Sequence, residues 1–117
     1  MAVIFDFDDT LVPDTTTQLL QKYEINPEKF WSKDVRALID SGYDPTLAYL
    51  NRFLENIGKG RPFDKLTNRD LHNFGKTLDD KFFSGLPQIF DDLKQIVKKF
   101  KDIDIEFYIQ IISKLII

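Results

Sequence analysis

The stretch that decides the fold is Val3-Ile4-Phe5-Asp6-Phe7-Asp8-Asp9-Thr10-Leu11, close to the N-terminus. An apolar run suited to a buried β-strand, residues 2–5, ends abruptly in the carboxylates of Asp6 and Asp8 and the hydroxyl of Thr10. Carboxylates at the end of a buried strand cost desolvation free energy unless a cation, hydrogen bonds or water meet them. Ligands of open α/β sheets bind at the carboxyl ends of the strands. The stretch therefore predicts a site for a divalent metal and a phosphate group at the carboxyl end of this strand.

The segment Asp6-Phe7-Asp8-Asp9-Thr10-Leu11-Val12 resembles motif I of the haloacid dehalogenase-like (HAD) hydrolase superfamily. In that motif, apolar residues precede Asp-x-Asp-x-Thr-Leu/Val. The resemblance implies an α/β fold with a HAD-like Rossmannoid core of parallel strands and helices, and a helical cap inserted into it. The alternative interpretation of the same residues is an acidic loop that caps the next helix.

The resemblance also implies roles for individual residues. Asp6 is the expected nucleophile, which attacks a phosphoryl group to form an aspartyl-phosphate. Asp8 is the expected general acid for the leaving oxygen and then the base that activates water. Mg²⁺ is the expected cofactor, bound by Asp6 and by the backbone carbonyl of Asp8. Thr10 is expected to hold Asp8 in place and to contribute to substrate binding. A second aspartate favours phosphomonoester hydrolysis over dehalogenation, with a small phosphorylated metabolite as the substrate class.

Composition limits the other possibilities. The 117 residues are 43% apolar and 30% charged, with a formal net charge of -3, which describes an acidic protein without a basic nucleic-acid surface. The absence of cysteine excludes disulfides and cysteine-ligated zinc. Neither a secretory signal nor an apolar run long enough for a membrane span is present, so we expect no membrane contact and a cytoplasmic location.

The remainder of the chain is predicted to be mostly helical. Apolar periodicity and helix-start signals predict six helices. Three have both bounds: residues 15–23, 33–41 (with Gly42 after its end) and 88–100. The others begin at Asn26-Pro27, at Asp44-Pro45 and at Thr67, the last ending at about Lys81. In the helix that begins at Asp44-Pro45, Leu47, Leu50, Leu54 and Ile57 recur at i, i+3, i+7 and i+10. A second buried strand is expected over residues 103–112.

This order resembles a HAD protein with a type 1 cap. Residues 1–14 would form the first core strand and the motif I loop, 15–81 the helical cap, and 82–117 a core helix and second strand. The family's motif II, a serine or threonine that binds phosphoryl oxygens, has its only candidate in Ser113. A free-standing helical bundle, with an accidental motif match, is the alternative for the helical middle.

The chain departs from the family after the second strand. A later lysine (motif III) and acidic pair (motif IV) have no counterpart in this sequence, so we expect a truncated HAD chain with an incomplete two-stranded core. Two hypotheses follow: a magnesium-dependent phosphatase impaired by the missing motifs, or a non-catalytic remnant acting as an oligomerising or binding module. The apolar tail over residues 109–117 favours a homo-oligomer formed through the C-terminal strand.

Overall fold

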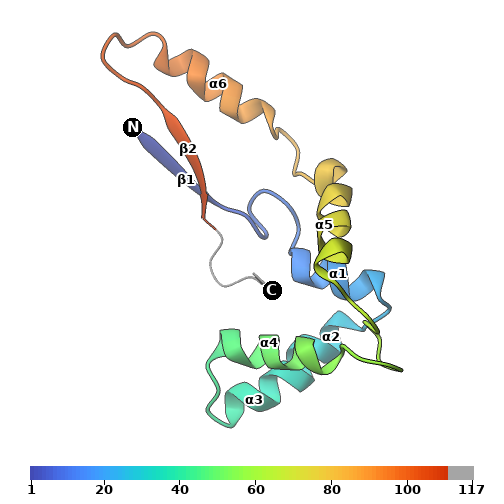
Figure 1. Ribbon diagram of the computed structural model, residues 1–117. Helices are drawn as coiled ribbons and strands as arrows, with labels where there is room; N and C mark the ends of the chain where they lie inside the picture. The colour runs from blue at the N-terminus through green and yellow to red at the C-terminus, as the bar shows by residue number, and fades with distance from the viewer. Residues whose placement is uncertain (111–117) are drawn as a thin grey trace. The chain divides into compact units, whose positions relative to one another are not determined.

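A computed structural model of the protein describes residues 1–110 and shows a mixed α/β chain that is about half helical (Figure 1). The chain divides into two compact units. The sheet unit consists of Met1–Thr15 and the described residues from Thr77 onward, and the helical unit consists of Thr16–Lys76. No helix within residues 1–110 is long and apolar enough to cross a membrane.

The sheet unit contains two parallel strands and one main helix. Strand β1 (Ala2–Asp6) pairs with β2 (Glu106–Gln110), and its register places Ala2 opposite Glu106. Helix α6 (Gln88–Val97) connects to β2 and packs on one face of the sheet, where Phe90 lies 5.5 Å from Phe5 and 5.1 Å from Phe107 between ring centroids. The prediction of two parallel strands joined through an amphipathic helix is confirmed.

The two strands are shorter and less buried than the sequence predicts. Strand β2 begins at Glu106 rather than Ile103, because residues 103–105 lie outside the strand, and the predicted positions 111–112 fall outside the described residues. Ile4 in β1 is 61% exposed and Tyr108 in β2 is 52% exposed. The prediction of two buried strands was therefore wrong, since α6 covers one face of the sheet and the other stays open.

The helical unit has its own hydrophobic core. Its elements are α1 (Thr15–Lys22, whose first residue belongs to the sheet unit), α2 (Pro27–Lys29), the π-helical η1 (Phe30–Val35), α3 (Arg36–Asp40), α4 (Pro45–Glu55) and α5 (Asn68–Lys76). Its buried core residues are Leu19, Leu20, Phe30, Val35, Ala48, Tyr49, Phe53 and Phe63. Apolar side chains from the helices and from the loop that carries Phe63 thus meet in one cluster.

The predicted helix starts and stops are confirmed at several positions. The Asn26 side chain accepts a hydrogen bond from the Lys29 amide at 3.0 Å, and Asp44 accepts from the amides of Thr46 and Leu47 at 2.9 and 3.2 Å. Gly42 has a φ of +101°, the left-handed conformation that ends a helix most readily when the residue is glycine. These local signals depend on residue chemistry alone, which is why the sequence predicts them.

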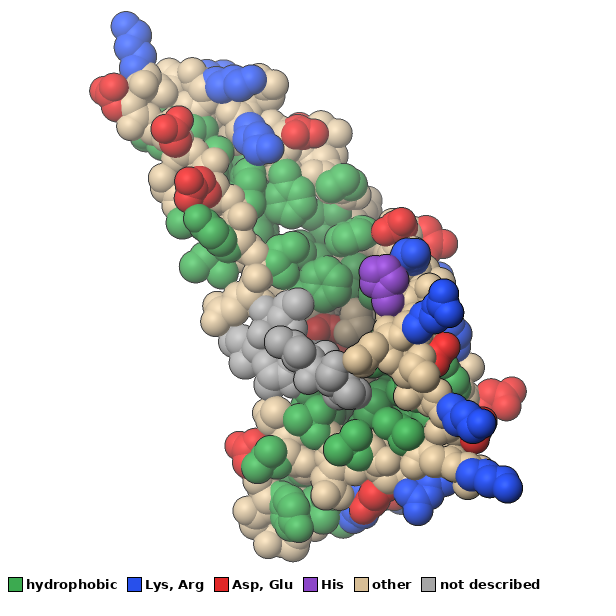
Figure 2. All heavy atoms as spheres, viewed as in Figure 1, with side chains coloured by type: hydrophobic (Ala, Val, Ile, Leu, Met, Phe, Trp, Pro, Cys, Tyr) green, Lys and Arg blue, Asp and Glu red, His purple; other side chains and the backbone are tan. Residues whose placement is uncertain are grey.

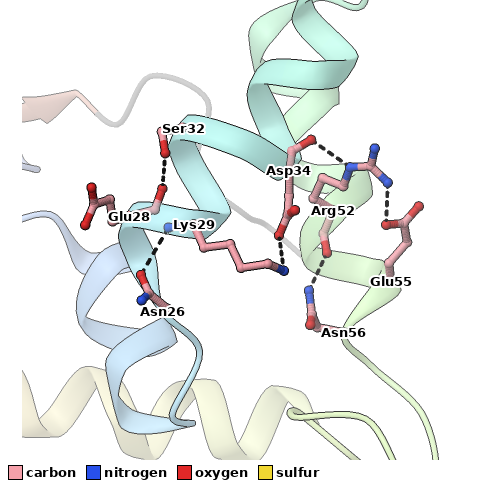
Figure 3. A network of polar contacts seen from close by, with 8 residues as sticks. All are labelled: Asn26, Glu28, Lys29, Ser32, Asp34, Arg52, Glu55 and Asn56. Atoms are coloured by element: carbon pink, nitrogen blue, oxygen red, sulfur yellow. Dashed lines mark hydrogen bonds and ion pairs between the residues drawn. The ribbon is translucent and has the colours of Figure 1, made fainter.

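The predicted break between the helix from Asn26-Pro27 and the helix over 33–41 was wrong. Helical structure continues from Pro27 to Asp40, with the π-helical η1 in its middle. The carbonyl of Asp34 in η1 accepts a hydrogen bond from Arg52 Nε at 2.9 Å, and Arg52 also binds Glu55 at 2.8 Å (Figure 3). Arg52 of α4 thereby supplies a donor to a carbonyl within the irregular segment, a tertiary contact that no local pattern reveals.

The apolar face predicted for α4 was wrong in part. Leu47 and Leu54 are 61% and 54% exposed, whereas Ala48, Tyr49 and Phe53 are buried. Aromatic partners explain this choice, because Tyr49 packs on Trp31 and Phe53 packs on Phe63, with centroid distances of 5.6 and 4.5 Å. Aromatic rings bury more area than leucine, so they decide which side of the helix faces the core.

Helix α5 begins as predicted but ends sooner. The Thr67 amide and hydroxyl donate to Asp70 at 2.8 and 2.7 Å, and the Asp70 amide donates to Thr67 Oγ1 at 3.3 Å, which forms a capping box at the predicted start. The α-helix ends at Lys76 and a 3₁₀ turn, η2 (Thr77–Asp80), follows it. The predicted end at about Lys81 therefore merged an α-helix with a separate tighter turn.

The capping box makes the stability of α5 sensitive to acid. Hydrogen bonds from the hydroxyl and amide of Thr67 hold the pKa of Asp70 below its ordinary value of 3.8. A carboxylate whose folded pKa is lowered stabilises the fold fully above its unfolded pKa, and this contribution is lost as pH falls through the folded value. We therefore expect Asp70→Asn to lower the free energy of unfolding at pH 6. The difference between the free energies of unfolding at pH 6 and about pH 3 should be smaller in the variant than in the original chain. Denaturant unfolding at both pH values checks this, and an unchanged difference in the variant would contradict it.

Candidate functional site

The candidate site begins where β1 ends. Asp6 is the last residue of the strand and its side chain is exposed. The hydroxyl of Thr10 donates to Asp6 Oδ2 at 3.4 Å, a long and weak hydrogen bond. The structure thus brings together Asp6 and Thr10, two of the residues predicted for the site, and leaves the Asp6 carboxylate accessible from solvent.

A tight loop then turns the chain back on itself. The carbonyl of Phe7 accepts hydrogen bonds from the amides of Thr10, Leu11 and Val12 at 3.3, 2.9 and 3.3 Å, and Asp9 adopts a φ of +57°. Aspartate tolerates this left-handed conformation better than most residues. Leu11 and Val12 are buried, with exposed fractions of 2% and 0%, so apolar anchoring fixes the loop beneath the carboxylates.

Asp8 is held by the start of helix α1. Its Oδ1 accepts from the Thr15 amide at 2.7 Å and from the Thr15 hydroxyl at 2.6 Å, and the residue is half-buried. The Thr10 hydroxyl donates to Asp6, and the hydrogen bonds described for Asp8 come from Thr15, so the expectation that Thr10 holds Asp8 stays a prediction. A carboxylate that receives helix-terminal amides is stabilised there, which explains why Thr15 captures it.

The acidic loop therefore also stabilises the start of helix α1. Asp9 Oδ1 accepts from the amide of Asp14 at 2.9 Å, next to the Asp8–Thr15 contact. The alternative interpretation, an acidic loop that caps the next helix, describes Asp8 correctly, whereas Asp9 binds the amide of Asp14 just before α1. It does not account for Asp6, which lies at the strand end and binds no helix amide in the described hydrogen bonds.

A hollow of about 410 Å³ lies beside the loop within the sheet unit. Phe5, Thr10 and Leu11 line one side, and residues 83–86, Ile89 and Asp92 line the other. The Phe83 amide donates to the Leu11 carbonyl at 2.9 Å and ties the two sides together. Ser84 and Asp92 are polar residues at this hollow that no sequence pattern indicated, because their approach depends on the return of the chain to the sheet.

The donor set fits Mg²⁺ only in part. Asp6 supplies an exposed carboxylate, which is the oxygen ligand that this cation prefers, and Mg²⁺ commonly keeps several waters. Within residues 1–110, however, no group of three or more His, Cys, Asp or Glu side chains is arranged to hold a metal ion. The predicted phosphate-binding residue Ser113 lies outside the described residues. Within the described residues, Asp6 and Asp8 therefore do not form a closed cage for a metal ion.

The Asp8–Thr15 contact gives a direct prediction. Thr15→Val removes the hydroxyl donor but keeps the amide and the side-chain volume, so the local opening free energy should fall by about 1 kcal/mol. Amide hydrogen exchange at residues 8–15 measures that opening. Thr15→Ser keeps the donor and should exchange at nearly the original rate. Equal exchange in the valine variant and the original chain would show that the hydroxyl contributes nothing.

Comparison with known proteins gives one informative similarity. The chain is similar to an uncharacterized protein of Borreliella burgdorferi. The two are 34% identical over an alignment of 121 positions, which covers 97% of this chain. The matched segment makes up 41% of that relative, so this chain spans about two fifths of the relative's length. No model of a known protein family matches the chain, and no solved structure matches it.

Proposed function

We propose that this chain carries the first part of a HAD-type active site for magnesium-dependent hydrolysis of small phosphomonoesters. The observation that supports the proposal is the placement of Asp6 at the end of a parallel strand, exposed, with Asp8 two residues later and fixed by Thr15. The carboxyl end of a parallel strand is where α/β folds place their ligands.

The two aspartates have complementary tasks in the proposed reaction. An Asp6 carboxylate oxygen attacks phosphorus, and the bond from phosphorus to the ester oxygen breaks. Asp8 gives a proton to the departing alkoxide, and it later takes a proton from the water that attacks the aspartyl-phosphate and releases inorganic phosphate. Mg²⁺, when bound, would neutralise phosphate charge at this site.

The surroundings of each carboxylate suit these tasks. Asp6 is exposed, and within residues 1–110 the hydrogen bond described for its side chain is the 3.4 Å contact with Thr10, so an incoming phosphate can reach it. Asp8 is half-buried and oriented by two short hydrogen bonds from Thr15, which makes Thr15 a positioning residue. A fixed acid and an accessible nucleophile on one loop reduce the entropy cost of aligning the reacting groups.

Hydrolysis of a generic aryl phosphate tests the proposal. We expect release of the phenol in the presence of magnesium and its loss after chelation, with recovery when magnesium is restored. The alternative function, a non-catalytic HAD-derived binding module, predicts no turnover under either condition. Turnover that persists unchanged in chelator would contradict the magnesium-dependent mechanism.

A further inference from the structure

We propose that the hollow beside the acidic loop binds a small amphipathic amine, a ligand with an apolar body and one protonated amino group. The hollow lies within the sheet unit, and its volume of about 410 Å³ falls in the range of about 300–1,000 Å³ that is typical of ligand pockets. Asp6 is not among the residues described as lining it. Binding there therefore does not depend on whether Asp6 is catalytic.

The first observation is that the fold holds both walls of the hollow in place. Leu11 is 2% exposed and anchors the acidic loop, and its carbonyl accepts from the Phe83 amide at 2.9 Å. In the opposite wall, the Leu86 amide donates to the Phe83 carbonyl at 3.2 Å. The Ile89 amide donates to the Gly85 carbonyl at 3.0 Å and joins this wall to α6. A ligand that enters walls already fixed loses little binding free energy to ordering them.

The second observation is the apolar surface that the hollow presents to solvent. Phe83 and Ile89 are 42% and 39% exposed there, and a side-chain carbon added at Gly85 would meet no atom within 4 Å. The apolar residues that line the hollow are Phe5, Leu11, Phe83, Leu86 and Ile89. Figure 2 shows hydrophobic side chains gathered at the surface of the unit that contains the sheet. An apolar body in the hollow would remove part of this area from water, which favours binding.

The third observation is the charge at the hollow. Asp92 is the charged residue among those described as lining it, and its side chain is exposed. Its Oδ1 accepts a hydrogen bond from Gln88 Nε2 at 3.0 Å. Thr10, which also lines the hollow, donates to the Asp6 carboxylate at 3.4 Å, so a second negative charge lies one side chain away. Two carboxylates favour a cationic group over an anionic one, and the apolar walls favour an apolar body attached to it.

Three matched probes test the proposal on the full chain: 3-phenylpropylamine, 3-phenylpropanol and 3-phenylpropanoate. They share one apolar body and differ only in a positive, neutral or negative end group. In an NMR titration, the methyl signals of Leu11, Leu86 and Ile89 should shift until the site is saturated. The amine should bind about two- to fivefold more tightly than the alcohol, as expected for an exposed ion pair, and the carboxylate should bind more weakly than the alcohol. Equal affinities for the three probes, or a preference for the carboxylate, would overturn the proposal.

A second isoleucine on the same helix separates a defined site from general apolar association. Ile96 of α6 is 52% exposed and is not among the residues described as lining the hollow, so its methyl signals should stay in place. Ile89→Ala removes part of the apolar wall and should weaken all three probes by about threefold or more, whereas Ile96→Ala should not. Equal shifts at Ile89 and Ile96 would mean that the probes bind to any apolar surface, which also contradicts the proposal.

Two neighbouring aspartates test the position of the amino group. Asp92→Asn should remove most of the preference for the amine over the alcohol, while the asparagine oxygen can still accept the hydrogen bond from Gln88. Asp91→Asn removes the same charge at a position that is not described as lining the hollow, and it should keep the preference. Both aspartates are exposed, so both variants should fold. An unchanged preference in Asp92→Asn would show that this carboxylate does not hold the amine and would overturn the assignment.

Discussion

Replacing Asp6 with asparagine is expected to abolish magnesium-dependent hydrolysis of an aryl phosphate, with a loss of about a thousandfold or more in kcat. The amide is a far weaker nucleophile than the carboxylate, and it also removes the charged oxygen expected to bind magnesium. Asp6 is exposed, and the hydrogen bond described for its side chain is the weak 3.4 Å contact with Thr10, so the substitution should leave the fold intact. Initial rates with saturating substrate, alongside unfolding curves of both proteins, check the result.

Asp9→Asn is the matched control for this experiment. Asp9 lies in the same loop, and an asparagine oxygen can still accept the hydrogen bond that Asp14 donates at 2.9 Å. The φ of +57° at this position also suits asparagine, so neither strain nor a lost contact is expected. Both variants lose one negative charge, so a general electrostatic effect would appear equally in each. An equal loss of kcat in the two variants, or no loss in Asp6→Asn, would show that Asp6 is not the nucleophile.

Replacing Phe53 with alanine is expected to destabilise the helical unit by about 3–5 kcal/mol. The Phe53 side chain is fully buried, and its ring lies 4.5 Å from that of Phe63, so truncation leaves a cavity at the centre of the core. Trp31, the single tryptophan, packs against Phe30 and Tyr49 in the same unit. Its fluorescence during denaturant unfolding therefore reports on the helical unit, even if the sheet unit unfolds separately.

Leu54→Ala provides the control on the same helix. Leu54 follows Phe53 directly but is 54% exposed, so its truncation should cost less than about 1 kcal/mol. The two variants remove apolar atoms from adjacent positions and have similar effects on helix propensity. A comparable loss in both would mean that burial of the Phe53 face does not determine the stability of α4.

Local chemistry predicts much of the helical part of the fold. The side chains of Asn26, Asp44 and Thr67 each accept from a helix amide as their residue types predict, because a cap needs only neighbours in sequence. The faces of α4 could not be predicted in the same way. Leucine spacing favours Leu47 and Leu54, but the aromatic contacts with Trp31 and Phe63 come from distant segments.

The candidate site shows the same division. The residue types and spacing in the Asp6–Thr10 segment predict a strand end with clustered carboxylates, and the structure confirms that Asp6 ends β1. The partner of Asp8 could not be identified in advance, because Thr15 approaches only when the loop reverses over buried Leu11 and Val12. The polar residues of the adjacent hollow, Ser84 and Asp92, likewise depend on how a distant segment returns to the sheet.

The pairing of β1 with β2 also sets the order in which the protein acquires its structure during synthesis. Ala2 pairs with Glu106, so the sheet joins opposite ends of the described chain, whereas the helical unit is formed by contiguous residues, Thr16–Lys76. Chains leave the ribosome from the N-terminus, and short-range contacts form before long loops close. Strand β1 therefore emerges before the helices and waits for β2 while they assemble. The segment that carries Asp6 is made before the helical unit but is fixed in place after it.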